Sequence, residues 1–278
     1  MHVSSSSEGI LAQHAMPSVQ DEPYYVAGAD EVAVFEQCHQ HQLAVMIKGP
    51  TGCGKTRFVE HMAWRLQRPL ITISCHDDLT ASDLVGRFLI QHDRTVWQDG
   101  PLAVAARQGA ICYLDEVVEA RQDTVVVLHS LTDHRRTIAL EKTGELITAA
   151  PGFQLVVSYN PGYQRMLKDM KPSTRQRFVA LEFDFPPERT ETAIVAHEGG
   201  VDALVAGNLV TLAHQLRGLR DRGLAEVPST RLLIAAARLH AGGIALERAC
   251  ELAVVAPLSD DDTLIAAMND LINLTLRR

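Results

Sequence analysis

Cysteines are few in this sequence of 278 residues, and the five that occur stand singly. An odd number without a C-x-x-C pair indicates neither a disulfide framework nor a cysteine-based metal site. Apolar runs of about 18 residues, the length needed to span a bilayer, are also missing. The first residues do not show the basic and then apolar pattern of a signal peptide. We therefore expect a cytoplasmic protein without a membrane span.

Basic clusters are missing as well. The 26 Lys and Arg residues are outweighed by 34 Asp and Glu, which gives a net charge of −8. No run of Lys or Arg is long enough to follow a phosphate backbone, so nucleic acid is not expected as the main partner. What the sequence does have is 46% hydrophobic residues. In a chain of this length, that content suits one large α/β domain and a smaller second one.

A glycine-rich segment matches the phosphate-binding pattern G-x-x-x-x-G-K-S/T. It reads GPTGCGKT and lies between an apolar run, Leu43–Ile47, and a helical pattern, Arg57–Leu66. This strand, loop and helix order is the setting that a P-loop requires. Its backbone N–H groups point at one anion, and the helix adds its positive end. The candidate nucleotide-binding residues are Gly49, Pro50, Thr51, Gly52, Cys53, Gly54, Lys55, Thr56 and Arg57.

Two of these residues have specific roles in such a loop. Lys55 is expected to reach the β- and γ-phosphates of ATP, and the Thr56 hydroxyl is expected to bind Mg²⁺. A second apolar strand, Ala110–Glu116, ends in adjacent carboxylates. We expect Asp115 to hold Mg²⁺ through a water and Glu116 to polarise the attacking water. A chance glycine turn and an ordinary acidic helix cap are the alternatives, but the two motifs together favour an Mg·ATP site.

Three further polar residues are candidates for catalysis. Asn160 ends an apolar strand, Phe153–Asn160, which we expect between the other two, so that its amide orients water together with Glu116. Alone, this Asn would be an ordinary turn former. Arg175 and Arg177 precede an alternating strand, Val179–Phe185. Guanidinium groups in this position suit a neighbouring subunit's γ-phosphate, although surface ion pairs are the alternative.

The chain around this region divides into three parts. Residues 1–21 are rich in Ser, Gln and Pro and are expected to form a mobile arm. Residues 22–187 form the predicted nucleotide-binding domain. In its first segment, Tyr24, Tyr25 and Val26 are candidates to flank the adenine, or alternatively to pack the arm onto the domain. After Pro186-Pro187 only helical patterns follow, which predicts a helical lid domain over 188–278.

The lid is expected to contain four helices and one candidate site residue. Ser229 is a plausible N-cap, which places Arg231 in the first turn of its helix, where a positive charge gains nothing from the helix dipole. A contact with the γ-phosphate would explain why an arginine occupies this position, and a surface ion pair is the alternative. The predicted helices are Leu204–Leu219, Ser229–His240, Ile244–Val254 and Thr263–Leu276.

This order of parts resembles the AAA+ ATPases over nearly the whole chain. Within them the chain resembles the MoxR branch, and most closely the CbbQ/NorQ subgroup at its CbbQ end. The entry into the first strand, His41–Ala44, departs from the Arg-Leu-Pro lead-in of the subgroup, which does not affect the catalytic residues. The closer resemblance is carried by the stretches KGPTGCGKTRFVEHMAWRL, ITISCHDDLTASDLVGRFLI, TVWQDGPL, ICYLDEVVEARQDT, LEKTGELI and KPSTRQRF.

The resemblance implies a homo-hexameric ring with ATP at subunit interfaces. It also implies two hairpin insertions, at residues 83–97 and 136–147, with Thr143-Gly144 as a turn. Exposed apolar residues on such hairpins would bind a client protein. Phe88 and Trp97 are candidates for that surface, although burial under the hairpin is equally compatible with the sequence.

The resemblance further implies a partner protein with a von Willebrand A domain, and a client enzyme. In CbbQ-like members the client is Rubisco, from which inhibitory sugar phosphates are released; in NorQ-like members it is nitric oxide reductase. We favour Rubisco. Three other functions are compatible with part of these motifs: a nucleotide-switched binding module without significant hydrolysis, a DNA-loading AAA+ protein, and a small-molecule kinase.

Overall fold

The computed structural model describes residues 21–91, 94–161, 170–219 and 226–276. Its centre is a parallel five-stranded sheet in the order β2, β5, β8, β1, β9. The predicted α/β fold is confirmed, and β8 lies between β5 and β1 as expected. The arm expected over residues 1–21 lies outside the described residues, apart from Asp21. The strands are β1 (Val45–Lys48), β2 (Leu70–Ser74), β5 (Ile111–Asp115), β8 (Gln154–Tyr159) and β9 (Val179–Glu182).

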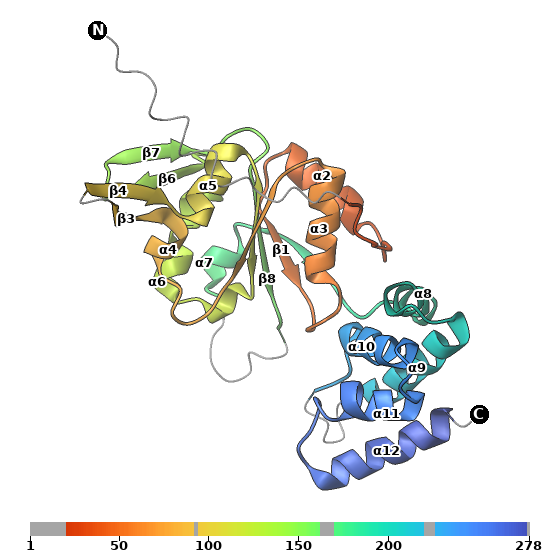
Figure 1. The fold of residues 1–278 in the computed structure, drawn as a ribbon. Helices are drawn as coiled ribbons and strands as arrows, with labels where there is room; N and C mark the ends of the chain where they lie inside the picture. Colours follow the sequence, from red (N-terminus) through yellow and green to blue (C-terminus); the bar gives the residue numbers. More distant parts are fainter. Residues whose placement is uncertain (1–20, 92–93, 162–169, 220–225, 277–278) are drawn as a thin grey trace.

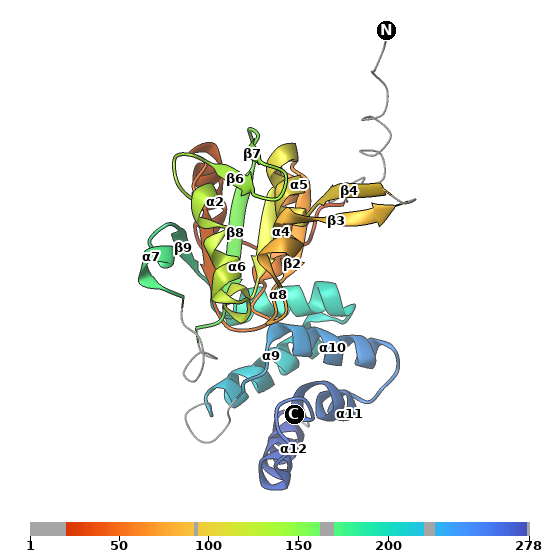
Figure 2. The same cartoon turned by 90° about the vertical axis from the view of Figure 1, so that its left-hand side faces the viewer.

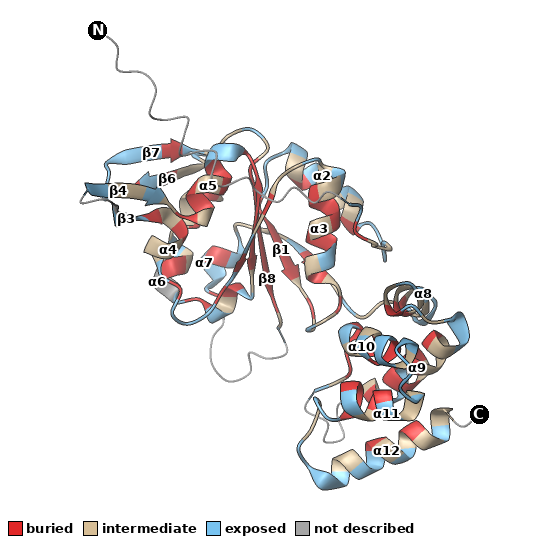
Figure 3. Cartoon of the chain, in the orientation of Figure 1, coloured by how far each residue is buried: buried red, intermediate tan, exposed pale blue. Residues whose placement is uncertain are grey.

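Helices cover both faces of this sheet (Figure 1). Along β5, Ile111 and Tyr113 pack with the helices of one face, whereas Cys112 and Leu114 pack with those of the other. Because successive side chains of a strand point to opposite faces, a sheet covered twice needs apolar residues at every position. This explains the continuous apolar runs in the sequence and the buried strands in Figure 3. One face carries α2 (Glu31–Gln40) and α3 (Lys55–Arg65); the other carries α4 (Ala81–Val85), α5 (Pro101–Gln108) and α6 (Gln122–Val126).

The parallel strands bring the chemically important segments to one edge. β1 runs into the glycine-rich loop, β5 ends at Asp115, and β8 ends just before Asn160. Ligands of open α/β sheets bind at the carboxyl ends of the strands, which is this edge. Short elements connect these parts: η1 (Val117–Glu119), η2 (His129–Leu131) and α7 (Pro172–Arg175).

The structure has an antiparallel hairpin in each of the two expected insertions. β3 (Gly86–Gln91) pairs with β4 (Arg94–Asp99) and projects away from the sheet, as Figure 2 shows. β6 (Thr137–Leu140) pairs with β7 (Glu145–Thr148), and Gly144 between them has a φ of 73°. A positive φ is a backbone conformation that glycine adopts readily, which suits it to this turn.

The aromatic residues of the first hairpin differ in exposure. Phe88 is 46% exposed and Ile90 83% exposed. Trp97 is half-buried, packs against the main core, and donates its indole N–H to Asp99 over 2.7 Å. The rings of Phe88 and Trp97 touch edge to face, with centroids 5.1 Å apart. The hairpin therefore exposes Phe88 and Ile90 to solvent, whereas Trp97 packs the hairpin against the main core.

The C-terminal part consists of helices around a core of their own. The buried residues of this core include Leu209, Leu233 and Val254. It begins with a helix that the sequence reasoning missed, α8, because few apolar residues mark its buried side. Within the described residues, no helix combines the length and apolar character needed to cross a membrane. The helices are α8 (Glu188–Gly199), α9 (Ala203–Arg217), α10 (Thr230–Ala241), α11 (Leu246–Cys250), the π-helical turn η5 (Glu251–Val255) and α12 (Asp262–Leu276).

The last strand is shorter than predicted. The pattern indicated Val179–Phe185, whereas β9 ends at Glu182. The ring of Phe185 instead lies under the guanidinium of Arg217 on α9, 3.8 Å from it. Residues 183–187 therefore form the linker between the sheet and the helical part.

Candidate nucleotide-binding site

A cavity of about 830 Å³ lies between the sheet edge and the C-terminal helices. Its lining brings together most of the residues predicted from sequence: Thr51 to Arg57 of the loop, Asp115 and Glu116 after β5, and Arg231 of α10. Asn160, Arg175 and Arg177 are not among the lining residues. The first segment contributes Tyr24, Tyr25 and Val26, which were candidates to flank a base.

The glycine-rich loop has the backbone that anion binding requires. Gly52 has a φ of 72°, and Gly54, at the N-cap of α3, has a φ of 102°. These left-handed residues turn the chain so that α3 begins at Lys55 with its positive end toward the cavity. The Lys55 ammonium is buried and donates hydrogen bonds to the carbonyls of Gly49 (2.8 Å) and Pro50 (2.9 Å). A desolvated cation here strengthens the attraction for phosphate.

Asp115 is oriented by two hydroxyl groups. Its Oδ1 accepts a hydrogen bond from Tyr113 over 2.7 Å and another from Ser158 on β8. Burial, and then the Asp115 charge, raise the pKa of Tyr113, so the phenol keeps its proton at neutral pH. The sequence reasoning missed both residues. Tyr113 stands two positions before Asp115 on β5, and Ser158 stands two positions before Asn160, which follows β8; the two-residue period of a strand was the signal.

Glu116 has a strained backbone. It lies in the left-handed region, with a φ of 56° and a ψ of 47°, and its N–H donates to Ser158 Oγ over 3.1 Å. For a residue other than glycine this conformation costs about 1 to 2 kcal/mol. The conformation turns the chain sharply at the strand end, and the Glu116 side chain is exposed and lines the cavity.

Asn160 contacts the glycine-rich loop directly. Its Nδ2 donates to Thr51 Oγ1 over 3.2 Å. The amide therefore connects the end of β8 to the loop that follows β1, its neighbour in the sheet.

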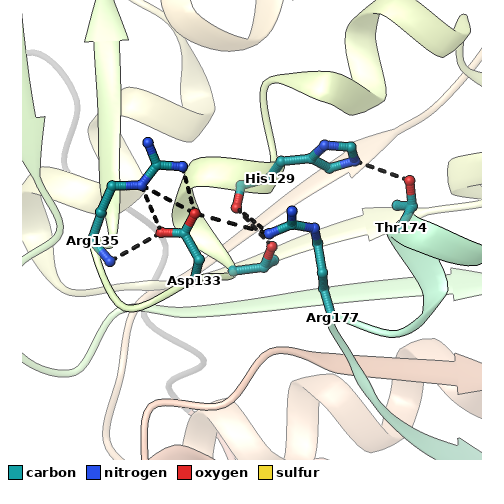
Figure 4. A network of polar contacts seen from close by, with 6 residues as sticks. His129, Asp133, Arg135, Thr174 and Arg177 are labelled. Atoms are coloured by element: carbon teal, nitrogen blue, oxygen red, sulfur yellow. Dashed lines mark hydrogen bonds and ion pairs between the residues drawn. The ribbon is translucent and has the colours of Figure 1, made fainter.

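The two candidate arginines before β9 differ in their surroundings. Arg175 is exposed. The side chain of Arg177 is 34% exposed and lies beside η2, where it donates to the His129 carbonyl over 3.3 Å and lies 3.9 Å from Asp133 (Figure 4). Asp133 is also held bidentately by Arg135, and these hydrogen bonds lower its pKa to about 2. Arg177 therefore belongs to a polar network that ends next to β6.

Arg231 lies where α10 approaches the glycine-rich loop. A Cβ built on Gly52 would come within 2.6 Å of Ser229 Oγ and 3.5 Å of the Arg231 Cβ, so glycine permits this approach. Ser229 is the N-cap residue, as predicted, but its side chain makes no capping hydrogen bond. Its hydroxyl faces the loop instead.

The tyrosines of the first segment make different contacts. Tyr25 donates to Glu31 over 2.7 Å, and Glu31 also accepts the N–H groups of Gly28 and Ala29. Burial, and then this carboxylate, raise the pKa of Tyr25. Tyr24 instead stacks on His197 of α8. Both tyrosines thus line the cavity and hold the first segment against the domain, and a contact with the adenine stays a prediction.

An ion-pair cluster that the sequence did not indicate lines the same cavity. Glu198 of α8 lies 3.4 Å from Arg57 of α3 and 3.2 Å from Arg238 of α10. Arg57, predicted as a nucleotide contact, therefore also joins the sheet part to the helical part. Such pairing between distant segments has no local sequence signal.

The residues present fit a magnesium nucleotide. The Thr56 hydroxyl and the Asp115 carboxylate line one cavity with the buried ammonium of Lys55. In the described part of the chain, no group of three or more His, Cys, Asp or Glu residues forms a metal site by itself. Magnesium suits this situation because it binds through one or two protein oxygens, water and the phosphates of a nucleotide.

Family models match both parts of the chain. One described as AAA domain (dynein-related subfamily) matches residues 44–178, and one described as CbbQ/NirQ/NorQ C-terminal matches residues 191–275.

Full-length relatives are also similar. Protein CbbQ of Hydrogenophilus thermoluteolus is 57% identical over 250 residues, covering 90% of this chain and 94% of that protein. Protein NorQ of Paracoccus denitrificans is 58% identical over 251 residues, covering 90% and 93%. Denitrification regulatory protein NirQ of Stutzerimonas stutzeri is 58% identical over 252 residues, covering 91% and 92%.

The RuvB Holliday junction branch migration motor of Thermotoga maritima has a related fold. Its TM-score is 0.52 at 16% identity, covering 88% of this chain and 68% of that one. At this identity the likeness concerns the fold alone.

Proposed function

Because the chain belongs to the CbbQ/NirQ/NorQ family of AAA+ proteins, we propose that it binds ATP with Mg²⁺ in this cavity and hydrolyses it. One observation carries the proposal: Lys55, Thr56, Asp115 and Glu116 line a single cavity. Lys55 and Thr56 begin α3 after the loop that follows β1, and Asp115 and Glu116 lie at the end of β5, with β8 between the two strands in the sheet. Their meeting supplies the phosphate cradle, the metal ligands and the base that phosphoryl transfer to water requires.

Each residue has a definite task in this mechanism. The Lys55 ammonium and the N–H groups of the loop bind the phosphate oxygens and balance their charge. Thr56 and Asp115 hold Mg²⁺, which supplies charge neutralisation when bound. Tyr113 and Ser158 keep the Asp115 carboxylate oriented. Glu116 polarises the attacking water, and we assign the positioning of that water to Asn160, which lies just behind the lining on Thr51.

A neighbouring subunit supplies the remaining charge. Arg175 and Arg177 lie outside the cavity lining, so one subunit does not place them on its own nucleotide. We assign Arg175 or Arg177 to a neighbour's γ-phosphate in a homo-hexameric ring, and Arg231 to the same phosphate from the lid. An arginine supplied by a partner accelerates hydrolysis by about 10³ to 10⁵ in other P-loop proteins. Nearly all activity should therefore depend on assembly.

The experiment is a titration with Mg·ATP combined with phosphate release. Binding should produce heat, and phosphate should appear at a rate per subunit that rises as the protein assembles. A titration without heat would remove the binding proposal. Heat without phosphate release would favour the nucleotide-switched module instead.

The finer proposal concerns the client enzyme. With a von Willebrand A partner, the protein would remodel Rubisco and release inhibitory sugar phosphates. Nitric oxide reductase is the second candidate, because relatives named NorQ and denitrification regulatory protein NirQ are as similar to this chain as CbbQ is. ATPase assays with each purified enzyme and the partner distinguish the two, since the true client should alter turnover and gain activity.

A further inference from the structure

Glu191 on α8 is a carboxylate without exposed surface. Its two oxygens accept hydrogen bonds from the Arg217 guanidinium, each over 2.7 Å. The Thr230 hydroxyl donates to Oε1 over 2.6 Å, and the His214 ring lies 3.7 Å from Oε2. A buried charge is tolerated only when it is paired and hydrogen-bonded. Here the partners come from α9 and α10, so one carboxylate joins three lid helices.

Arg217 extends these contacts to the linker before α8 and to the segment that leads into α10. Its Nε donates to the Pro228 carbonyl over 2.9 Å, just before α10. Its guanidinium also lies 3.8 Å from the Phe185 ring, in the linker after β9. Phe185 lines the nucleotide cavity. The planar five-donor group of arginine makes these contacts at once, which a lysine ammonium does not reproduce.

These contacts fix the first turn of α10. Arg217 holds the Pro228 carbonyl, Glu191 holds the Thr230 hydroxyl, and Ser229 between them faces Gly52 of the glycine-rich loop. Arg231 follows directly and lines the cavity. A displacement of Thr230 therefore displaces Arg231 relative to the loop.

We infer that Glu191, Arg217 and Thr230 position Arg231 at the γ-phosphate and thereby set the preference for ATP over ADP. This inference rests on the proposed contact of Arg231 with that phosphate. A buried ion pair is often no more stabilising than an apolar replacement, so stability alone is a weak reason for this arrangement. A positioning role explains the arrangement better, because a buried polar network whose hydrogen bonds are all satisfied holds its members in a single arrangement.

The test compares equilibrium affinities for a non-hydrolysable ATP analogue and for ADP, each with Mg²⁺ and the full chain. Thr230→Val keeps the side-chain shape and removes only the hydroxyl. We expect the ratio of the two affinities to fall about three- to tenfold, the size expected for one hydrogen bond to a charged group transmitted in part. Thr230→Ser retains the hydroxyl, so its ratio should match that of the unchanged protein.

A matched control makes the same change elsewhere in the lid. Thr211 on α9 lines a separate hollow beside α12. Thr211→Val should leave the ratio unchanged. Thermal unfolding of each variant shows whether the lid is folded. A fall in melting temperature with an unchanged ratio would overturn the inference, because a purely structural role predicts that result.

A double-mutant cycle separates this inference from the proposed function. Arg231→Ala alone should lower the ratio, and Thr230→Val should add nothing in that background. If Arg231→Ala leaves the ratio unchanged, the proposed role of Arg231 fails and the inference fails with it. If Arg231→Ala lowers the ratio but Thr230→Val does not, only the inference fails. Additive effects would also overturn it, since Thr230 would then act without Arg231.

A second substitution covers the case in which Thr230→Val does not fold. Arg217→Lys keeps the charge and loses the two-point contact with Glu191. It should lower the ratio in the same direction. Its control is Arg248→Lys, since Arg248 pairs with Glu251 over 2.7 Å on the surface and is 61% exposed. Equal ratios for the two lysine variants would overturn the inference.

Discussion

The ring of Tyr24 lies almost parallel to the imidazole of His197, with centroids 3.7 Å apart and an angle of 12° between the planes. Tyr24 precedes α2, and His197 lies near the end of α8, so the stack joins the first segment to the lid beside the cavity. The next residue, Glu198, pairs with Arg57 of α3. A ring stack contributes about 0.5 to 1.5 kcal/mol and an exposed ion pair up to about 1 kcal/mol. Each of these contacts is therefore a modest restraint between the sheet part and the C-terminal helices.

Removing the stack should accelerate nucleotide release. We expect Tyr24→Ala to raise the dissociation rate of a fluorescent ADP about two- to tenfold, the equivalent of the stacking energy. Stopped-flow displacement by unlabelled ADP measures this rate. Tyr24→Phe keeps the ring and is the control, so its rate should match that of the unchanged protein. An unaltered rate for Tyr24→Ala would mean that the stack does not restrain the lid.

Glu116→Gln should separate binding from hydrolysis. Glutamine keeps the size of the side chain but is not a base, so the affinity for Mg·ATP should stay within about twofold while turnover falls about 10² to 10⁴-fold. Calorimetry and phosphate release measure the two quantities. The left-handed backbone at this position is a reason to avoid β-branched replacements, which would add strain. Turnover that survives the substitution would remove Glu116 from the role of base.

Ser158→Ala should raise the Mg²⁺ concentration needed for half-maximal activity. The Ser158 hydroxyl donates to Asp115 and accepts the Glu116 N–H, so its loss leaves only the Tyr113 hydroxyl to orient the carboxylate that we propose binds Mg²⁺. Loss of a partner that orients a metal ligand typically costs about 10- to 100-fold in metal affinity or activity. A Mg²⁺ titration of ATPase activity measures the shift.

Ser74→Ala is the matched control for this magnesium experiment. Ser74 ends β2 and lies opposite Asp115 in the sheet register, on the other side from β8. It is exposed, and we expect no shift from its substitution. Equal shifts for the two alanine variants would show that Ser158 has no specific role in orienting Asp115.

Local patterns were enough to predict the centre of this fold. The apolar runs before Gly49, Asp115 and Asn160 predicted three strands, since each strand is buried on both faces and each loop has its own motif. The same patterns predicted the cavity-lining residues of the loop and of β5. Tyr113 and Ser158 could have been predicted in the same way, because they stand two positions before Asp115 and Asn160.

The contacts between distant segments were not predictable. Glu191 and Glu198 lie on α8, whose buried side has few apolar residues. The partner of Glu191 lies on α9 and a partner of Glu198 lies on α3. Nothing in the local sequence distinguishes a buried glutamate from an exposed one until the fold supplies an arginine. The end of β9 was misplaced for a similar reason, because the Phe185 ring packs on Arg217 of the lid and not in the strand.

The last prediction concerns the arginines before β9. If one of them acts on a neighbouring subunit, its alanine variant keeps Glu116 and lacks only the arginine, whereas Glu116→Gln lacks only the base. Each variant should be nearly inactive alone. Mixed in equal amounts, they form interfaces that have both groups, and random assembly gives about a quarter of the unchanged protein's activity. Steady-state phosphate release from the mixture measures this recovery.

The same experiment distinguishes Arg175 from Arg177. The alanine variant of the arginine that acts in trans should be nearly inactive alone and recover activity on mixing, whereas the variant of an arginine without this role should be active alone. Arg135→Ala is the control, because Arg135 shares Asp133 with Arg177 within one chain and should keep activity when tested alone. Recovery with neither arginine variant would mean that hydrolysis needs no arginine from the next subunit, and would contradict the proposed ring mechanism.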